Sequence, residues 1–217
     1  STATAGLQDD GTLWAWGSNA TGQLGTDATA SQLVPHLVAP ARWQQISAGM
    51  TFSAGVQADG SLWAWSSAST IGYANSSATS LSGPTPVLPG SRWRSVSCGW
   101  DEAAAIRQDG TLWTWSEPLI NNVRTRLPAT QVSADTTWRS VSTGGSAGHF
   151  LAMKKDSSLW GWGYNGSGQV LPGGNWQLTA LVPVAPGSKW KSVSTGYSYT
   201  TAIRKDGTLW AWGDNQH

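Results

Sequence analysis

Short segments in which apolar and small residues alternate recur along the whole chain, and each follows an Asp-Gly or Asp-Ser turn. In Leu13–Gly17, which reads Leu-Trp-Ala-Trp-Gly, the two indoles are two residues apart and therefore project from one face of a strand. Leu13 and Ala15 project from the other face. An Asp-Gly pair between two apolar runs is a strong β-hairpin signal, because a tight turn needs positive φ. No segment has the 3.6-residue apolar period of a helix, so the pattern predicts an all-β protein.

This hairpin recurs with a period close to 50 residues. It occupies residues 10–17, 59–66, 109–116, 156–163 and 206–213. A second signature, Trp-(Gln/Arg/Lys)-(Gln/Ser)-(Ile/Val)-Ser-x-Gly, lies between the hairpins and begins at Trp43, Trp93, Trp138 and Trp190. About four short strands per unit are typical of a β-propeller blade. We therefore predict one propeller domain over residues 1–217, with four to five blades in the units 1–42 (partial), 43–92, 93–137, 138–189 and 190–217 (partial).

The two ends of the sequence do not supply a whole number of blades. Five hairpins are present but only four strands begin with the second signature, so the sequence starts inside one blade and stops inside another. Three arrangements fit: a five-bladed ring with one incomplete blade, an open fragment of a larger propeller, or ends that another subunit completes. Unpaired strand edges promote association, so self-association through open blade edges is one expected interaction.

Most of the 16 tryptophans belong to the two repeated signatures. We expect them to form the core, with the Trp face of one blade packed on the small-residue face of the next, each indole burying roughly 150–250 Å². The predicted core tryptophans are Trp14, Trp16, Trp43, Trp63, Trp65, Trp93, Trp113, Trp115, Trp138, Trp160, Trp162, Trp190, Trp210 and Trp212. Trp176 lies outside the repeat, and we expect it to pack on its own blade.

The two signatures, together with residues 18–25 (Ser-Asn-Ala-Thr-Gly-Gln-Leu-Gly), resemble the regulator of chromosome condensation repeat over the whole chain. The Asn-x-x-Gly-Gln-Leu-Gly stretch is intact in the first unit, recognisable at residues 165–170, and absent after Ser66 and Ser116. The resemblance implies a propeller whose relatives serve in GTPase exchange, as ubiquitin-ligase accessory domains, in photoreception and in bacterial adhesion. Function does not transfer with a fold.

Composition narrows the classes of partner. Only 12% of residues are charged and the formal net charge is +1, so we expect no basic field that could hold nucleic acid. No apolar run approaches the ~20 residues that span a bilayer, so membrane insertion is not expected. Cys98 is the single cysteine, which excludes an internal disulfide and predicts a small buried residue. His36, His149 and His217 show no metal-ligand spacing, so we predict no metal and no cofactor.

The loop after the second signature is the candidate binding site. The first position of this loop is occupied by Met50, Trp100, Gly145 and Tyr197 in the four units. Three of the four units therefore place a large apolar or aromatic residue there. Together with Asp101 these side chains are expected to form an aromatic collar at one end of the propeller. The plant ultraviolet photoreceptor of the family has Gly-Trp-Arg-His-Thr at this loop. Residues 99–103 read Gly-Trp-Asp-Glu-Ala, without the Arg and His, which argues against photoreception.

No nucleophile elbow, paired catalytic carboxylates or phosphate-binding glycine loop occurs in the sequence, so we do not expect an enzyme. The sequence favours a binding or assembly module for protein–protein interaction. Its low charge and Trp-rich repeats favour an exported bacterial protein at the cell surface or outside the cell. Two alternatives stay open: a carbohydrate-binding propeller that uses loop aromatics, and a regulatory domain of a larger protein such as a GTPase exchange factor.

Overall fold

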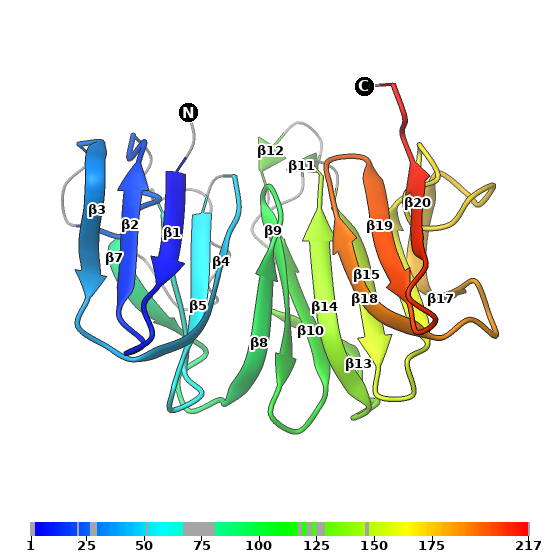
Figure 1. The fold of residues 1–217 in the computed structure, drawn as a ribbon, viewed down its shortest axis with the longest axis horizontal. Helices are drawn as coiled ribbons and strands as arrows, with labels where there is room; N and C mark the ends of the chain where they lie inside the picture. Colours follow the sequence, from blue (N-terminus) through cyan, green and yellow to red (C-terminus); the bar gives the residue numbers. More distant parts are fainter. Residues whose placement is uncertain are drawn as a thin grey trace.

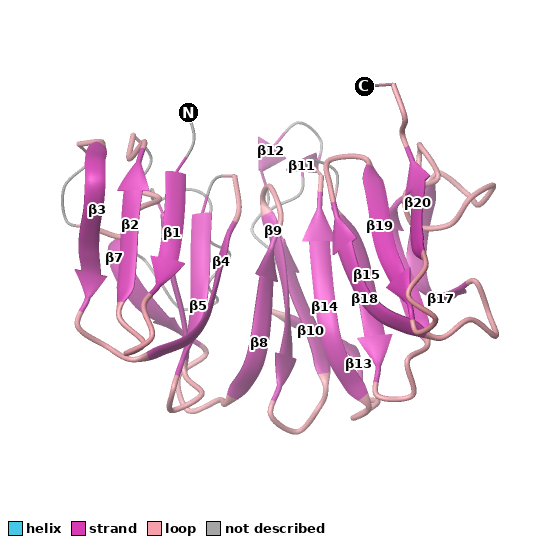
Figure 2. Ribbon diagram, in the orientation of Figure 1, coloured by secondary structure: helices cyan, strands magenta, loops and turns pink. Residues whose placement is uncertain are grey.

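The computed structural model describes residues 3–20, 22–26, 30–50, 52–66, 81–116, 119–120, 123–124, 129–145 and 148–216. Every regular element in these ranges is a β-strand (Figure 2). The same ranges hold no helix long and apolar enough to cross a membrane. The all-β prediction is confirmed.

The strands form five antiparallel sheets that follow one another in chain order, and a two-stranded ribbon lies within the third unit. Sheet 1 contains β1 (Ala3–Leu7), β2 (Leu13–Gly17) and β3 (Gln32–Ala39); sheet 2 contains β4 (Trp43–Ala48), β5 (Phe52–Gln57), β6 (Leu62–Ser66) and β7 (Leu81–Val87); sheet 3 contains β8 (Trp93–Cys98), β9 (Glu102–Arg107), β10 (Leu112–Ser116) and β13 (Thr130–Ser133); the ribbon contains β11 (Leu119–Ile120) and β12 (Val123–Arg124); sheet 4 contains β14 (Trp138–Gly144), β15 (His149–Lys154), β16 (Leu159–Tyr164) and β17 (Gln177–Val184); sheet 5 contains β18 (Trp190–Thr195), β19 (Tyr199–Arg204) and β20 (Leu209–Gly213).

The five sheets are the blades of an open arc. The strands β1, β4, β8, β14 and β18 contact one another in that order along its inside. Sheets 1 and 5 lie at opposite ends of the long axis of the molecule (Figure 1). No hydrophobic cluster joins these two sheets in the part of the chain that the structure describes. The structure therefore has the expected number of blades in an arc rather than a closed ring.

Each sheet packs its Trp face on the Leu and Ala face of the sheet before it. Trp93 and Trp115 of sheet 3 form one cluster with Leu62 and Ala64 of sheet 2. The same pairing joins sheets 1 and 2, sheets 3 and 4, and sheets 4 and 5. This is the packing expected from the sequence, and it explains why large and small side chains alternate on the hairpin strands: the two faces fill one another without voids.

The hairpin turns use their aspartates for structure. In sheet 3 the Asp109 carboxylate accepts hydrogen bonds from the Thr111 backbone N–H (2.9 Å) and hydroxyl (2.6 Å), and Trp113 Nε1 donates to the same hydroxyl (2.9 Å). Gly110 has φ +91° and a Cβ there would meet the Thr136 carbonyl, so only glycine fits. Asp10, Asp59, Asp156 and Asp206 make the equivalent bonds. Because these bonds favour the ionised form, they lower the pKa of each turn carboxyl.

The tryptophans differ in burial according to their place in the sheet. The buried members are Trp43, Trp65, Trp93, Trp115, Trp138, Trp162 and Trp190, and the half-buried members are Trp14, Trp16, Trp63, Trp113, Trp160 and Trp212. Trp210 is 44% exposed, which corrects its assignment to the core. Trp63 and Trp160 face Pro86 and Pro183 on a fourth strand, whereas sheet 5 has three described strands.

Trp176 also corrects the sequence prediction. It is 70% exposed in the loop between β16 and β17 and does not pack into its blade. Its backbone carbonyl accepts a hydrogen bond from the Asn165 N–H (2.8 Å). Cys98, in contrast, is buried as predicted, and burial raises the pKa of its thiol to about 12.

Candidate functional site

The loops that join the first and second strands of sheets 2 to 5 lie along the upper rim in Figure 1. Their backbones pack directly against one another: the Met50 N–H donates to the Gly99 carbonyl (3.1 Å). A Cβ on Gly49 would clash with that same carbonyl oxygen, and a Cβ on Gly144 would clash with the Gly196 carbonyl. The glycine that ends the second sequence signature is therefore required by the close approach of neighbouring blades.

Three of the predicted site residues come together on this rim. Met50 is 63% exposed and Tyr197 is 59% exposed, while Trp100 is half-buried. The Trp100 and Tyr197 rings contact each other with their centroids 5.8 Å apart. Gly145, at the aligned position of sheet 4, lies between them in the repeat order and carries no side chain, so the two rings can meet across that blade.

Tyr199 is a member of this surface that the sequence alignment did not include. It begins β19, two residues after Tyr197, and is 47% exposed. We call Met50, Trp100, Tyr197 and Tyr199 the collar. Asp101 is half-buried beside Trp100, and its N–H donates to Glu102 Oε2 (3.1 Å), so its backbone helps to hold the loop.

Two buried ionisable groups occupy the position that Tyr199 holds in sheet 5. Phe52, Glu102, His149 and Tyr199 are the first residues of the second strand in sheets 2, 3, 4 and 5. Burial raises the pKa of Glu102 to about 7, although its carboxylate accepts hydrogen bonds from the backbone N–H groups of Asp101 and Trp100. Burial also lowers the pKa of His149 to about 4. Beneath the collar therefore lie two ionisable groups whose charged forms are disfavoured by burial.

Sequence reasoning missed Glu102 and set His149 aside after a test for metal spacing alone. The available signal was the alignment itself, because a carboxyl and an imidazole replace phenylalanine at one repeat position. The residues that the structure describes hold no cluster of three or more His, Cys, Asp or Glu.

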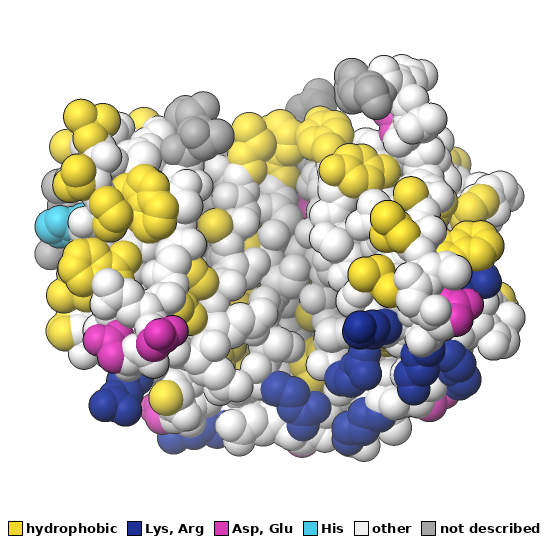
Figure 3. Space-filling view, viewed as in Figure 1, with side chains coloured by type: hydrophobic (Ala, Val, Ile, Leu, Met, Phe, Trp, Pro, Cys, Tyr) yellow, Lys and Arg dark blue, Asp and Glu magenta, His cyan; other side chains and the backbone are white. Residues whose placement is uncertain are grey.

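The two rims of the arc differ in character. Lysine and arginine gather along the lower edge in Figure 3, whereas hydrophobic side chains are prominent along the upper edge. Part of the basic charge is neutralised locally, since Lys154 pairs with Asp135 (2.7 Å) and Arg92 with Asp59 (3.8 Å). The even charge balance of the sequence therefore conceals an asymmetric distribution between the two rims.

Comparison with known proteins agrees with this architecture. Family models of the regulator of chromosome condensation (RCC1) repeat match residues 10–56 and 190–217. No curated protein matches the sequence. Human WBSCR16 superposes with a TM-score of 0.81 at 19% identity, over 94% of this chain and 56% of that protein. Yeast RCC1 (Prp20), solved bound to Kap60, superposes with a TM-score of 0.80 at 19% identity, over 97% and 54%.

A second structure of Prp20p from Saccharomyces cerevisiae, described with its binding to Gsp1p and histones, has a TM-score of 0.59 at 16% identity, over 97% of this chain and 69% of that one. The chain spans about half the length of the first two structures. At these identities the likeness shows the fold. The architecture is that of a β-propeller. Two segments of the chain, residues 10–56 and 190–217, match the regulator of chromosome condensation repeat.

Proposed function

We propose that this chain is a non-catalytic binding module that recognises a protein partner through the collar. The observation that carries the proposal is the exposure of Met50, Tyr197 and Tyr199 together on one rim, with Trp100 in ring contact with Tyr197. Tyr, Trp and Met are enriched in the cores of protein interfaces, where they supply large contact areas. A contiguous exposed apolar patch marks an interaction surface.

The chemistry of the remaining groups supports a binding role. The turn aspartates are engaged by their own hairpins, and the Cys98 thiol is buried with a pKa raised to about 12. Glu102 and His149 are buried below the rim, 4% and 1% exposed. A general base must reach its substrate within hydrogen-bonding distance, and burial of both groups opposes this.

The relatives support the same kind of partner. Yeast Prp20 was solved bound to Kap60 and was examined for binding to Gsp1p and histones, all of which are proteins. We extend to this chain only the general class, a protein partner. The low share of charged residues, 12%, supports a location outside the cell, which fractionation of the producing cells would test.

The experiment compares the chain with a collar variant, Met50→Ser, Trp100→Ala and Tyr197→Ser, as bait in extracts and culture medium of the source cells. The control variant, Leu33→Ser and Val34→Ser, removes hydrophobic side chains that are 95% and 67% exposed on β3. We expect one partner to bind the wild-type and control chains and not the collar variant. Equal capture by all three, or no capture by the wild-type chain, would contradict the proposal.

A further inference from the structure

Two loops of the chain are built on the same plan. Residues 19–25 follow β2 in sheet 1, and residues 165–171 follow β16 in sheet 4. Each begins with a buried asparagine: Asn19 Oδ1 accepts from the Leu24 N–H (3.0 Å), and Asn165 Oδ1 accepts from the Val170 N–H (2.9 Å). Asn165 Nδ2 also donates to the carbonyls of Leu171 and Asn175 (both 3.0 Å). In both loops, the asparagine side chain therefore ties together the residues that the structure describes.

The two loops differ in how they meet the tryptophan of the next sheet. Trp65 Nε1 donates to the Gln23 carbonyl (3.0 Å), and a Cβ on Gly25 would lie 2.7 Å from the Trp65 ring. The first loop thus closes on its indole, and only glycine allows that approach.

In the second loop Leu171 replaces this glycine, and Pro172, Gly173 and Gly174 follow it. Trp212, the equivalent of Trp65, has a buried Nε1 without a hydrogen-bond partner in the described structure. The Gln169 carbonyl, the equivalent of the Gln23 carbonyl, accepts a hydrogen bond from the Thr200 hydroxyl (2.7 Å) and none from Trp212.

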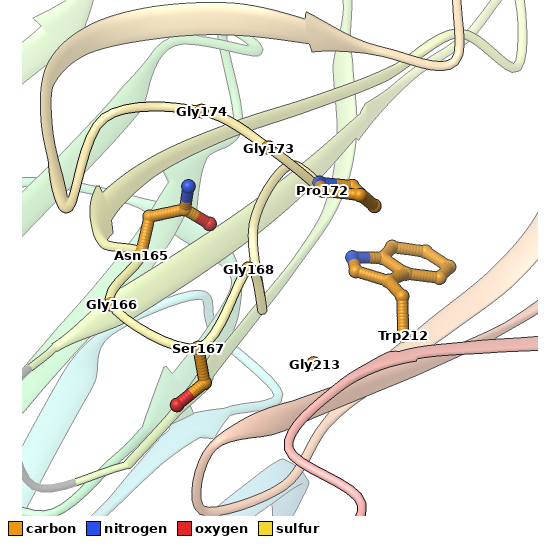
Figure 4. Close-up of a pocket in the computed structure, with 9 residues that line it drawn as sticks. All are labelled: Asn165, Gly166, Ser167, Gly168, Pro172, Gly173, Gly174, Trp212 and Gly213. Carbon is orange, nitrogen blue, oxygen red and sulfur yellow. The ribbon is translucent and has the colours of Figure 1, made fainter.

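The junction between this loop and sheet 5 contains a cavity of about 400 Å³ (Figure 4). Its walls are Asn165, Ser167, Pro172, Trp212 and five glycines. Figure 4 shows the Trp212 indole directed from β20 toward the loop, with Pro172 beside the ring. A Cβ on Gly173 would meet nothing within 4 Å, so the backbone there faces open space. This volume lies within the usual range of small-molecule sites, roughly 300–1,000 Å³.

The lining selects a chemical class of ligand. None of the described side chains that line the cavity is charged, so a phosphate, carboxylate or ammonium group would lose hydration without gaining a counter-charge. An aromatic ring offers a flat apolar surface, and glycine backbone and Ser167 surround it with neutral hydrogen-bonding groups. A pyranose has the same combination, since its C–H faces are apolar and its rim carries hydroxyls.

We propose that this cavity, which we call the Trp212 pocket, binds a neutral saccharide. The sugar ring stacks on the Trp212 indole, and its hydroxyls bond with Ser167 and the glycine backbone of residues 166–174. The site is separate from the collar, so it adds a ligand class to the chain and does not depend on the proposed protein partner.

The test is a panel of neutral glycans and of sialylated and sulfated glycans, followed by titration of each hit with tryptophan fluorescence and saturation-transfer NMR. We expect a neutral glycan to bind and the anionic series to bind no better. Ser167→Trp fills the mouth of the pocket from an exposed position and should lower affinity at least about tenfold, which corresponds to about 1.4 kcal/mol. Trp212→Leu should do the same by removing the stacking surface.

Two controls separate this pocket from the other exposed aromatics. Trp176→Ala removes an indole that is 70% exposed and does not line the pocket, so binding should persist. The collar variant should also retain it. Loss of binding in either control, retention in Ser167→Trp, or a panel without a neutral hit would each overturn the proposal. Because Ser167 is exposed, Ser167→Trp decides the question even if Trp212→Leu does not fold.

Discussion

Sheets 3 and 5 carry the same hairpin sequence but have very different surroundings. Leu112 of sheet 3 is fully buried beneath Trp138 of sheet 4, whereas Leu209, its equivalent in sheet 5, is 72% exposed. Trp113 is half-buried and Trp210 is 44% exposed. The hairpin sequence therefore specifies a blade with two apolar faces, and the neighbouring blade decides whether a face is buried. Stability in such a repeat chain is close to a sum of blade and interface contributions.

The two open faces are complementary. Sheet 5 exposes a Leu and Ala face, and sheet 1 presents the Trp face of Trp14 and Trp16 beyond which no sheet is described. The interface between two such faces occurs four times inside the arc. An exposed face of this kind is an association surface, which makes self-association at the ends a measurable extension of the comparison.

The largest expected difference concerns the matched leucines. Leu112→Ala should lower the free energy of unfolding by about 2–5 kcal/mol, because it leaves a cavity in a closed interface. Leu209→Ala should change it by less than about 0.5 kcal/mol, because this side chain is already largely in water. Urea unfolding, followed by tryptophan fluorescence, measures both. A cost for Leu209→Ala comparable with that of Leu112→Ala would show that a second molecule covers sheet 5 in solution.

The next effect concerns pH, at the strand position where sheets 3 and 4 carry Glu102 and His149 and sheet 5 carries Tyr199. Between about pH 4.5 and 7 the folded chain keeps the Glu102 proton that the unfolded chain has lost, so this group makes stability fall as pH rises. His149 acts in the opposite direction: stability falls as pH drops from 6.5 toward about 4, because only the unfolded chain takes up the proton.

The two groups offset each other in the wild-type chain, and single variants separate them. Glu102→Gln should leave a chain that loses stability in acid, and His149→Gln should leave one that loses stability as pH rises to about 7. Each effect amounts to roughly 3 kcal/mol, since one pKa unit corresponds to about 1.36 kcal/mol. Urea unfolding midpoints at about pH 4.5 and 7 measure the change in stability of each variant. If the stability of both variants changed with pH in the same direction, the opposite effects assigned to Glu102 and His149 would be wrong.

Most of the fold could be predicted from the repeat period of the sequence. The Asp-Gly turns and the Leu-Trp-x-Trp alternation correctly predicted the hairpins and the face that each indole takes, because both depend on local geometry. Burial of the last blade was not predictable in this way. Trp210 belongs to the same motif as Trp113, but its exposure depends on a fourth strand and a neighbouring sheet, which no local pattern encodes.

The site was only partly visible in the sequence. Alignment of the loop positions found Met50, Trp100 and Tyr197, because they hold one place in the repeat. It missed Tyr199 and Glu102, which take the place of the buried Phe52 at the first position of the second strand. The alignment considered only the loop positions and not this core position. The Trp212 pocket could not be predicted from the sequence, because it depends on the distance between the loop of sheet 4 and the tryptophan of sheet 5.

The smallest expected difference concerns the cations that cover the tryptophans. The guanidinium carbon of Arg107 lies 4.4 Å from the Trp113 ring centroid in sheet 3, and that of Arg204 lies 3.8 Å from the Trp210 centroid in sheet 5. A cation–π contact is worth about 0.5–1 kcal/mol at an exposed site and about 2 kcal/mol when desolvated. Arg107→Met should therefore cost more than Arg204→Met, although the second contact is shorter.

Arg107 also donates to the Ser91 hydroxyl (2.6 Å), so Ser91→Ala serves as the control that removes this bond alone. Subtracting its cost leaves the contribution of the ring contact. Amide hydrogen exchange in β10 and β20 gives a local readout, since opening of one blade need not unfold the whole chain. If Arg204→Met proved as costly as Arg107→Met after this correction, the distance between cation and ring, rather than the exposure of the ring to water, would control the strength of the contact. The contrast between inner and terminal blades would then not extend to their charged side chains.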